Sequence, residues 1–352
     1  MITAHKRSIA GAIAAAALFG ASTPAAKALV GDVHPFALAG FLYAGSGLGL
    51  ILWMIARRLS SGRRIQLGIA NADLPWLAGA VLTGGVAAPA LLMFGLATTQ
   101  ATVASLLLNL ESVFTALIAW FVFRENFDKR IALGMALITA GGVVLSVAPG
   151  GLEGVHVPAL LVAAACLLWA IDNNLTRRIS AGDPIAIAAI KGCVAGAANL
   201  ALAGMAGDSW PALGTLTAAL CIGFAGYGLS LVLFVVALRE LGAARTGAYF
   251  STAPFVGVAL AIGALGEPAG ATFWIAAALM GWGVWLHVSE RHEHTHMHEL
   301  LDHSHEHSHD EHHRHTHDFD WNGAEPHVHP HRHDPATHRH PHFPDIHHRH
   351  GH

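Results

Sequence analysis

The sequence predicts an all-α integral membrane protein: ten transmembrane helices in two inverted five-helix repeats, then a disordered tail rich in histidine. Three observations predict this. Ten apolar stretches are long enough to cross a bilayer, and the second five echo the first five. Hydrophobic residues make up 53% of the chain and charged residues only 12%, more apolar surface than a water-soluble domain could bury. Because five is odd, the second half starts on the other side of the membrane, so similar halves must be inverted.

The spans are expected to be helical because a backbone exposed to lipid must satisfy its own hydrogen bonds. A hydrocarbon core of about 30 Å needs about 20 helical residues. Most stretches reach that length, and the fifth and sixth are at its lower limit. The predicted spans are 8–30, 33–56, 74–97, 101–123, 131–148, 158–176, 184–204, 213–237, 242–264 and 271–289.

Basic residues fall on one side of this topology. They precede span 1, occupy every second loop and follow span 10, whereas the alternate loops contain no Lys or Arg. These residues are Lys6, Arg7, Arg57, Arg58, Arg63, Arg64, Arg124, Lys129, Arg130, Arg177, Arg178, Arg239, Arg245 and Arg291. The positive-inside rule therefore predicts that both termini are cytoplasmic, in the inner (plasma) membrane of the cell. Residues 1–28 also have the pattern of a signal peptide, but its cleavage would leave nine spans and destroy the repeat.

The internal repeat is clearest between residues 100–130 and 242–272, which align without a gap at an offset of 142. Ser112 then meets Pro254, and Glu125 meets Glu267. We divide the chain into a first repeat (1–150), a second repeat (151–289) and a tail (290–352). Inverted repeats are typical of secondary transporters, in which a central site opens to each side in turn.

The motifs of this repeat resemble the drug/metabolite transporter superfamily, specifically its EamA-type members. They are Phe19-Gly20 through Lys27, Pro35 opening span 2, Phe123-Arg124-Glu125 ending span 4, and Gly266-Glu267-Pro268 in the second copy. The resemblance covers residues 8–289 and implies ten helices and transport of small solutes, often export. One departure is Glu111-Ser112, where the family commonly has proline.

Ionisable residues inside a membrane need a reason, because a central charge costs about 2.5–3.5 kcal/mol on insertion scales. Glu111, in the middle of span 4 and close to Asn109, is the best candidate for a solute-binding or proton-coupling carboxylate. Lys191 lies about two turns into span 7 and is a natural partner for Glu111 or for Asp172 of span 6. Asp172 is a further candidate, although a neighbouring arginine would also pair with it.

Two more candidates for the solute pathway are weaker. Lys27 belongs to the family motif but lies near the end of span 1, where a lysine often extends to the interface. Pro254 is placed to break span 9 beside a cavity.

The composition changes abruptly in the tail, where residues 287–352 hold 24 of the 27 histidines. Apolar residues are too few there to build a core, so we expect disorder. Neutral imidazole is a good ligand for Zn²⁺, Ni²⁺, Co²⁺ and Cu²⁺. The predicted metal ligands form His-x-His ladders: His292, His294, His296, His298, His303, His305, His307, His309, His312, His313, His315, His317, His327, His329, His331 and His333. Alternatively, the tail gains charge below about pH 6.5, the unperturbed histidine pKa, and binds the anionic inner leaflet.

No nucleotide-binding loop or nucleophile motif is present, so we expect a carrier and not an enzyme, with no cofactor for transport. The favoured hypothesis is an exporter of a small organic solute whose tail binds divalent transition metals. The alternative is an exporter of divalent Ni, Co or Zn with the tail as collector or sensor. A third, a metal-storage protein with a membrane anchor, would not need ten spans. The expected partners are the lipid bilayer, the solute and metal ions, with no nucleic acid; a homodimer remains open.

Overall fold

The computed structural model describes residues 2–61, 71–123, 129–146, 157–179, 183–207, 210–241, 243–289, 293–298, 301–307, 327–333 and 336–341. The chain divides into two units, Met1–Glu290 and Arg291–His352. The regular elements described in the first unit are helices: α1 (Ile2–Lys27), α2 (Pro35–Ser61), η1 (Asn71–Asp73), α3 (Leu74–Ala80), η2 (Val81–Ala87), α4 (Ala88–Thr98), α5 (Ala101–Leu107), α6 (Leu110–Phe123), α7 (Lys129–Ser146), α8 (Val157–Ile179), α9 (Pro184–Met205), α10 (Leu213–Gly223), η4 (Phe224–Leu229), α11 (Ser230–Leu241), α12 (Ala243–Phe250), α13 (Ala253–Leu265) and α14 (Ala271–Val288).

These helices confirm the predicted all-α membrane architecture. Within the described residues, nine helical stretches are long and apolar enough to cross a membrane. They correspond to nine of the ten predicted spans. The remaining prediction, 242–264, is found as two shorter helices, α12 and α13, of which α13 is apolar.

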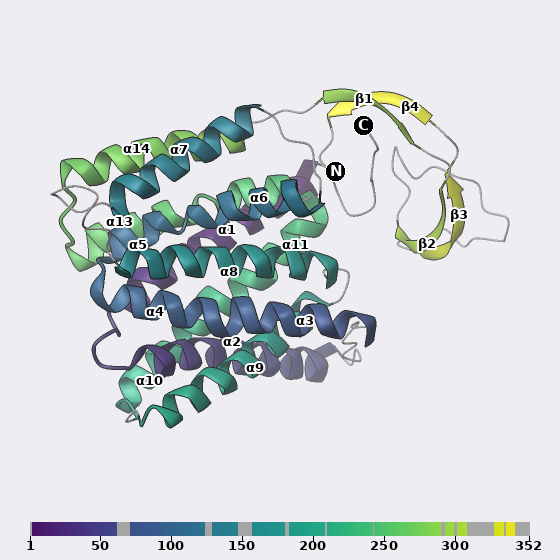
Figure 1. Cartoon of the computed structure of the whole chain (residues 1–352). Coiled ribbons are helices and arrows are strands. Elements are labelled where there is room, and N and C mark those ends of the chain that lie inside the picture. Colours follow the sequence, from purple (N-terminus) through teal and green to yellow (C-terminus); the bar gives the residue numbers. More distant parts are fainter. Residues whose placement is uncertain are drawn as a thin grey trace. The chain divides into compact units, whose positions relative to one another are not determined.

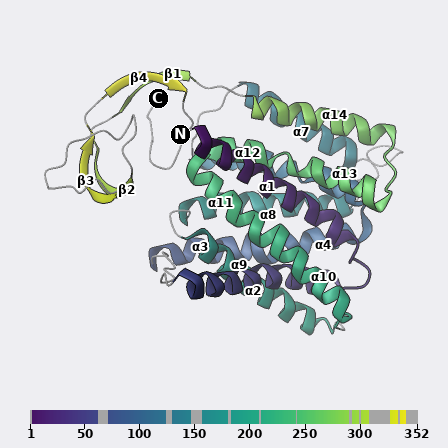
Figure 2. The ribbon, with the colours of Figure 1, turned by 180° about the vertical axis from the view of Figure 1, so that it is seen from behind.

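The packing of the helices repeats between the two halves. The second span of the first half, α2, packs against its counterpart α9, and the fifth span, α7, packs against α14. Figure 1 shows these two pairs at opposite edges of the unit, with α8 between them. The first span of each half contacts the third and fourth spans of the other: α8 packs against α4 and α6, and α1 against α11 and α13. Figure 2 shows α1, α11 and α13 from behind. Exchanging the halves leaves this pattern unchanged, as two inverted repeats require.

Glycines allow a close approach between α2 and α9. A Cβ atom at Gly192 would meet the backbone of Gly47, and one at Gly196 would meet the backbone of Ala44. Small residues let membrane helices approach in this way, where lipid supplies no hydrophobic driving force for association. The contact joins the two repeats directly.

Two of the predicted spans are not continuous helices. Span 4 is interrupted at Leu108 and Asn109, between α5 and α6. Span 9 is interrupted at Ser251 and Thr252, between α12 and α13. At the offset of 142, Asn109 corresponds to Ser251, so both breaks occupy the same place in the repeat. Pro254 follows the second break, and proline at the start of a helix is tolerated because its missing N–H is not needed there.

Spans 3 and 8 share another irregularity, a π-helical segment in the middle of each. These segments are η2 and η4. Adding 142 to the bounds of η2 gives residues 223–229, which nearly coincide with η4. Such widened turns free backbone carbonyls from the regular ladder and occur frequently at functional sites. Both halves therefore carry the same two departures from a regular helix.

The second unit differs from the expectation of disorder at four short strands: β1 (Glu293–His298), β2 (Leu301–His307), β3 (His327–His333) and β4 (Ala336–Pro341). β1 pairs with β4, and β2 pairs with β3, each antiparallel. The physical reason lies in the His-x-His ladders, whose period of two matches the alternation of an extended strand. The remaining tail residues lie outside the described part of the chain.

Candidate functional site

A buried ion pair joins α8 and α9, the first two spans of the second repeat. The Lys191 ammonium donates to both carboxylate oxygens of Asp172, at 2.6 and 2.7 Å. The Thr176 hydroxyl donates to the same carboxylate at 2.9 Å. Asp172 and Lys191 are 6% and 4% exposed. Of the partners considered from sequence, the structure thus selects Asp172 for Lys191.

Glu111 lies beside this pair and has a different partner. Its carboxylate accepts a hydrogen bond of 2.7 Å from the side-chain amide of Asn173. Asp172 and Lys191 are near enough to interact with it electrostatically. Glu111 falls in the first turn of α6, directly after the break in span 4. A helix N-terminus favours a negative charge, which offsets part of the cost of ionising this buried carboxylate.

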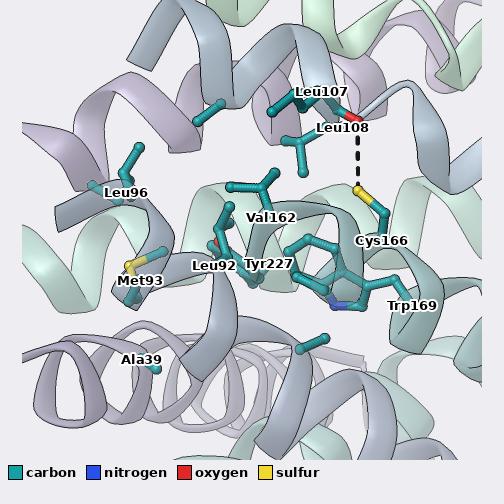
Figure 3. Packing of buried hydrophobic residues seen from close by; sticks show 14 of the residues in the cluster. Ala39, Leu92, Met93, Leu96, Leu107, Leu108, Val162, Cys166, Trp169 and Tyr227 are labelled. Carbon is teal, nitrogen blue, oxygen red and sulfur yellow. Dashed lines mark hydrogen bonds between the residues drawn. The ribbon is translucent and has the colours of Figure 1, made fainter. Parts of the chain in front are cut away.

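At the break the backbone N–H groups of Asn109 and Ser112 bond to carbonyls three residues back, and side chains add further hydrogen bonds to carbonyls there. The Cys166 thiol of α8 donates to the Leu107 carbonyl at 3.6 Å, as Figure 3 shows. The Ser112 hydroxyl donates to the Asn109 carbonyl at 2.7 Å. The Asn109 side-chain amide donates to the Leu106 carbonyl at 3.1 Å, so this predicted residue serves the break and not Glu111.

The π-helical segment η2 supplies a second set of polar groups. The Gly84 carbonyl accepts from the Tyr43 hydroxyl at 2.6 Å and from the Trp169 indole N–H at 2.9 Å. The Gly85 carbonyl accepts from the side-chain amide of Asn199 at 3.2 Å. These carbonyls fix the orientation of two aromatic side chains close to Asp172, and a Cβ atom at Gly84 would collide with the Asp172 carboxylate.

Aromatic rings from both repeats gather around Phe19 of α1. Its ring centroid lies 5.8 Å from that of Trp169, 5.9 Å from that of Tyr227 and 5.3 Å from that of Phe250. Tyr43 and Tyr227 lie 5.2 Å apart. Trp169 precedes Asn173 by four residues on α8, which is one turn or about 6 Å. The aromatic cluster, Phe19, Tyr43, Trp169, Tyr227 and Phe250, therefore adjoins the charged cluster, Glu111, Asp172, Asn173 and Lys191.

Two of the other predicted residues have structural partners elsewhere. The Lys27 ammonium donates to the Leu96 carbonyl near the end of α4, at 2.7 Å, where a helix favours a positive charge. Pro254 is buried at the start of α13. Neither side chain is brought to the charged cluster by a contact within the described residues.

Glu267, the residue that the repeat aligns with Glu125, joins the two repeats. After Gly266 ends α13 in the left-handed conformation (φ 67°), the Glu267 carboxylate accepts from the backbone N–H groups of Ala101 and Thr102, at 2.8 and 2.7 Å. It thereby caps α5 across 166 and 165 residues of sequence. Its repeat counterpart Glu125 lies outside the described residues.

Asn173, Tyr43, Asn199 and the η2 carbonyls escaped the sequence analysis. A neutral amide or phenol in a membrane helix carries little cost and so gives little signal. A helical wheel of span 6 would have helped, because Trp169 and Asn173 fall on one face at a spacing of four residues.

The predicted metal ligands divide between described strands and the rest of the tail. His294, His296 and His298 lie in β1, His303, His305 and His307 in β2, and His327, His329, His331 and His333 in β3. His292, His309, His312, His313, His315 and His317 lie outside the described residues. Among the residues that the structure describes, no cluster of three His, Cys, Asp or Glu side chains suits a metal ion.

Comparisons with known proteins bear on the helical unit. A family model described as the EamA-like transporter family matches residues 6–147 and again residues 156–289. A protein of Methanothermobacter thermautotrophicus described as an uncharacterized transporter is 32% identical over 292 residues, which cover 78% of this chain and 84% of that protein. A solved crystal structure, 21% identical, superimposes with a TM-score of 0.58 over 79% of this chain and 95% of its own, which supports the fold.

Proposed function

This chain belongs to the EamA-like transporter family of the drug/metabolite transporter superfamily, and we propose that it exports a small organic solute across the inner membrane of the cell. The observation that carries this proposal is the charged cluster beside the breaks. Glu111, Asp172 and Lys191 are the kind of groups that membranes tolerate only with a function or a partner. Glu111 lies in α6 directly after the break in span 4, and the Asp172–Lys191 pair joins α8 to α9 beside it; discontinuous helices of this sort form transporter sites.

Orientation follows from the loops. The basic residues of alternate loops favour cytoplasmic termini by the positive-inside rule. The tail then lies in the cytoplasm, on the side from which an exporter collects its solute. Since no nucleotide-binding motif is present in the sequence, an ion or solute gradient would supply the energy.

The tail binds divalent transition metals in this proposal. The strand register supports it: His303 pairs with His331, His305 with His329 and His307 with His327. Residues directly opposite in an antiparallel pair have Cα atoms about 4.5–5.5 Å apart. Two imidazoles at that spacing suit a shared Zn²⁺, Ni²⁺, Co²⁺ or Cu²⁺ ion, since all four accept nitrogen ligands.

A growth screen tests the proposed function. The screen compares cells that express the full chain, cells that express the Glu111→Gln variant and cells that carry an empty vector. All three are challenged with toxic metabolites and with metal salts. We expect the wild type to protect against at least one organic compound and the variant to lose that protection. Protection against no organic compound would reject the proposal.

A divalent metal exporter is the second candidate, and the histidine tail is the observation that favours it. Under this alternative the expressing cells accumulate less Ni²⁺, Co²⁺ or Zn²⁺, and Glu111→Gln abolishes the difference. Elemental analysis of washed cells measures it directly, and unchanged metal content would discard the alternative. The charged cluster itself speaks for an organic solute, because two carboxylates, one already paired with lysine, are few ligands for a dehydrated divalent ion.

A further inference from the structure

The charged cluster has one carboxylate more than its cations can neutralise. Lys191 is bound to both oxygens of Asp172, so these two charges cancel. Glu111 remains, and its hydrogen-bond partner Asn173 is a neutral amide. Within the part of the chain that the structure describes, no basic side chain forms an ion pair with Glu111. The site is therefore prepared for one positive charge.

The surroundings of Glu111 leave room for a positively charged ligand. Glu111 lies in the first turn of α6, where the helix dipole offsets part of the cost of a buried negative charge. The Asn173 amide donates to only one of its two oxygens, Oε1. A carboxylate accepts at about four lone-pair positions, so Glu111 retains room for a cationic donor.

The aromatic cluster favours a cation that carries an aromatic or apolar group. The side chains of Phe19, Trp169 and Tyr227 pack together in this cluster. Trp169 precedes Asn173 by one turn of α8, which is about 6 Å. Tyr227 is 6% exposed, and its hydroxyl has no hydrogen-bond partner within the described residues. A buried hydroxyl without a partner costs free energy unless a ligand or water satisfies it. Aromatic faces also attract ammonium groups.

We infer that the transported solute is an organic monocation: a primary amine attached to an aromatic or apolar body about one helical turn away. This inference rests on the proposed function and names the solute class of the same site. The ammonium binds the Glu111 carboxylate, and the body lies among Phe19, Trp169 and Tyr227. The Tyr227 hydroxyl hydrogen-bonds to the bound solute.

The same contacts disfavour acids and zwitterions. A solute carboxylate would need a cation, and the candidate Lys191 is already held by Asp172 and by the Thr176 hydroxyl, whose oxygen lies 3.4 Å from its nitrogen. Separating a buried ion pair is expensive, because both charges would lose their partners. An amine without a carboxylate meets no such cost.

Binding to the purified full-length chain in lipid nanodiscs tests the inference. The probes are phenethylamine as the cation, 3-phenylpropionate as the anion, phenylalanine as the zwitterion and phenethyl alcohol as the neutral control. Titration calorimetry compares the wild type with Glu111→Gln, with Tyr227→Phe, and with Asp32→Asn, which removes an exposed acidic charge far outside the cluster. We expect phenethylamine to bind at least tenfold more tightly than the other three probes.

The variants test which residues bind phenethylamine. Glu111→Gln should weaken phenethylamine binding at least tenfold, Tyr227→Phe severalfold, and Asp32→Asn should leave it unchanged. Tyr227→Phe removes a hydroxyl without a protein partner, so it tests the site even where Glu111→Gln fails to fold. The inference would be overturned if 3-phenylpropionate or phenylalanine bound more tightly than phenethylamine, or if phenethylamine did not bind. It would also be overturned if both site variants bound phenethylamine with the same affinity as the wild type. The growth screen decides the proposed function separately, since an exporter of acids would pass it.

Discussion

At the scale of single residues, the charged side chains of the membrane-spanning helices have different partners. Lys191 and Asp172 neutralise one another, Lys27 binds the end of α4, and Glu111 is held by an amide. Their partners decide which one is available to a solute. Glu111 is the one without a basic partner in the described residues.

The Asp172–Lys191 pair makes a prediction about stability. Changing Lys191→Met leaves a buried carboxylate without its cation, which typically costs about 3–5 kcal/mol. The double variant Asp172→Asn with Lys191→Met should recover most of that loss, because no charge is then left alone. Thermal unfolding in detergent measures all three proteins. If the double variant is no more stable than Lys191→Met, the two side chains do not act as a pair.

Glu111 and Glu267 offer a matched comparison, since each is a carboxylate with hydrogen-bonded donors. We expect Glu111→Gln to lower transport roughly ten- to a hundredfold, the effect of about 1.5–3 kcal/mol from a charged hydrogen bond. Glu267→Gln weakens a helix cap and should cost stability of about 0.5–2 kcal/mol. Uptake into proteoliposomes, corrected for folded protein, compares the two. Equal loss of transport in both would mean that the site does not centre on Glu111.

At the scale of elements, the π-helical segments and the breaks shape the site. Gly84→Ala places a methyl group against the Asp172 carboxylate, so the ion pair must shift. We expect a clear loss of transport from this change, whereas Gly263→Ala in α13 has open space and should be tolerated. Uptake assays on both variants provide the measurement. Full activity of Gly84→Ala would show that η2 does not support the site.

The elements also show what a sequence can and cannot predict here. Hydropathy located the spans because lipid imposes a length and a composition. The offset of 142 located the repeat. Because a charge in lipid is costly, the sequence also predicted that Lys191 has an acidic partner. The π-helical segments did not follow, because tertiary partners such as Trp169 and Asn199 hold their carbonyls. The cap of α5 by Glu267 depends on a contact across more than 160 residues, which local patterns do not encode.

At the scale of the whole molecule, the tail and the helical unit are separate units, and the proposed function gives them separate tasks. Deleting residues 291–352 should therefore leave solute uptake within about twofold of the wild type while removing most metal binding. Uptake and equilibrium dialysis with Ni²⁺ and Zn²⁺ measure the two properties. Abolished uptake would show that transport requires the tail, as the metal-exporter alternative expects. A full-length chain with the His303, His305, His329 and His331 ladder changed to Asn is the matched control.

The inversion of the repeats underlies the whole account, because it creates a central site that both halves share. Labelling of single cysteines tests the inversion in a chain whose Cys166, Cys193 and Cys221 are replaced. The cysteines are introduced one at a time at the exposed positions Asp32, Ser60 and Ala206. Asp32 follows the first helix of the first repeat, and Ala206 follows the second helix of the second. In intact cells, a membrane-impermeant maleimide should label Asp32→Cys and Ala206→Cys but not Ser60→Cys. Labelling of Ala206→Cys only after the membrane is broken would contradict inverted repeats and the carrier built on them.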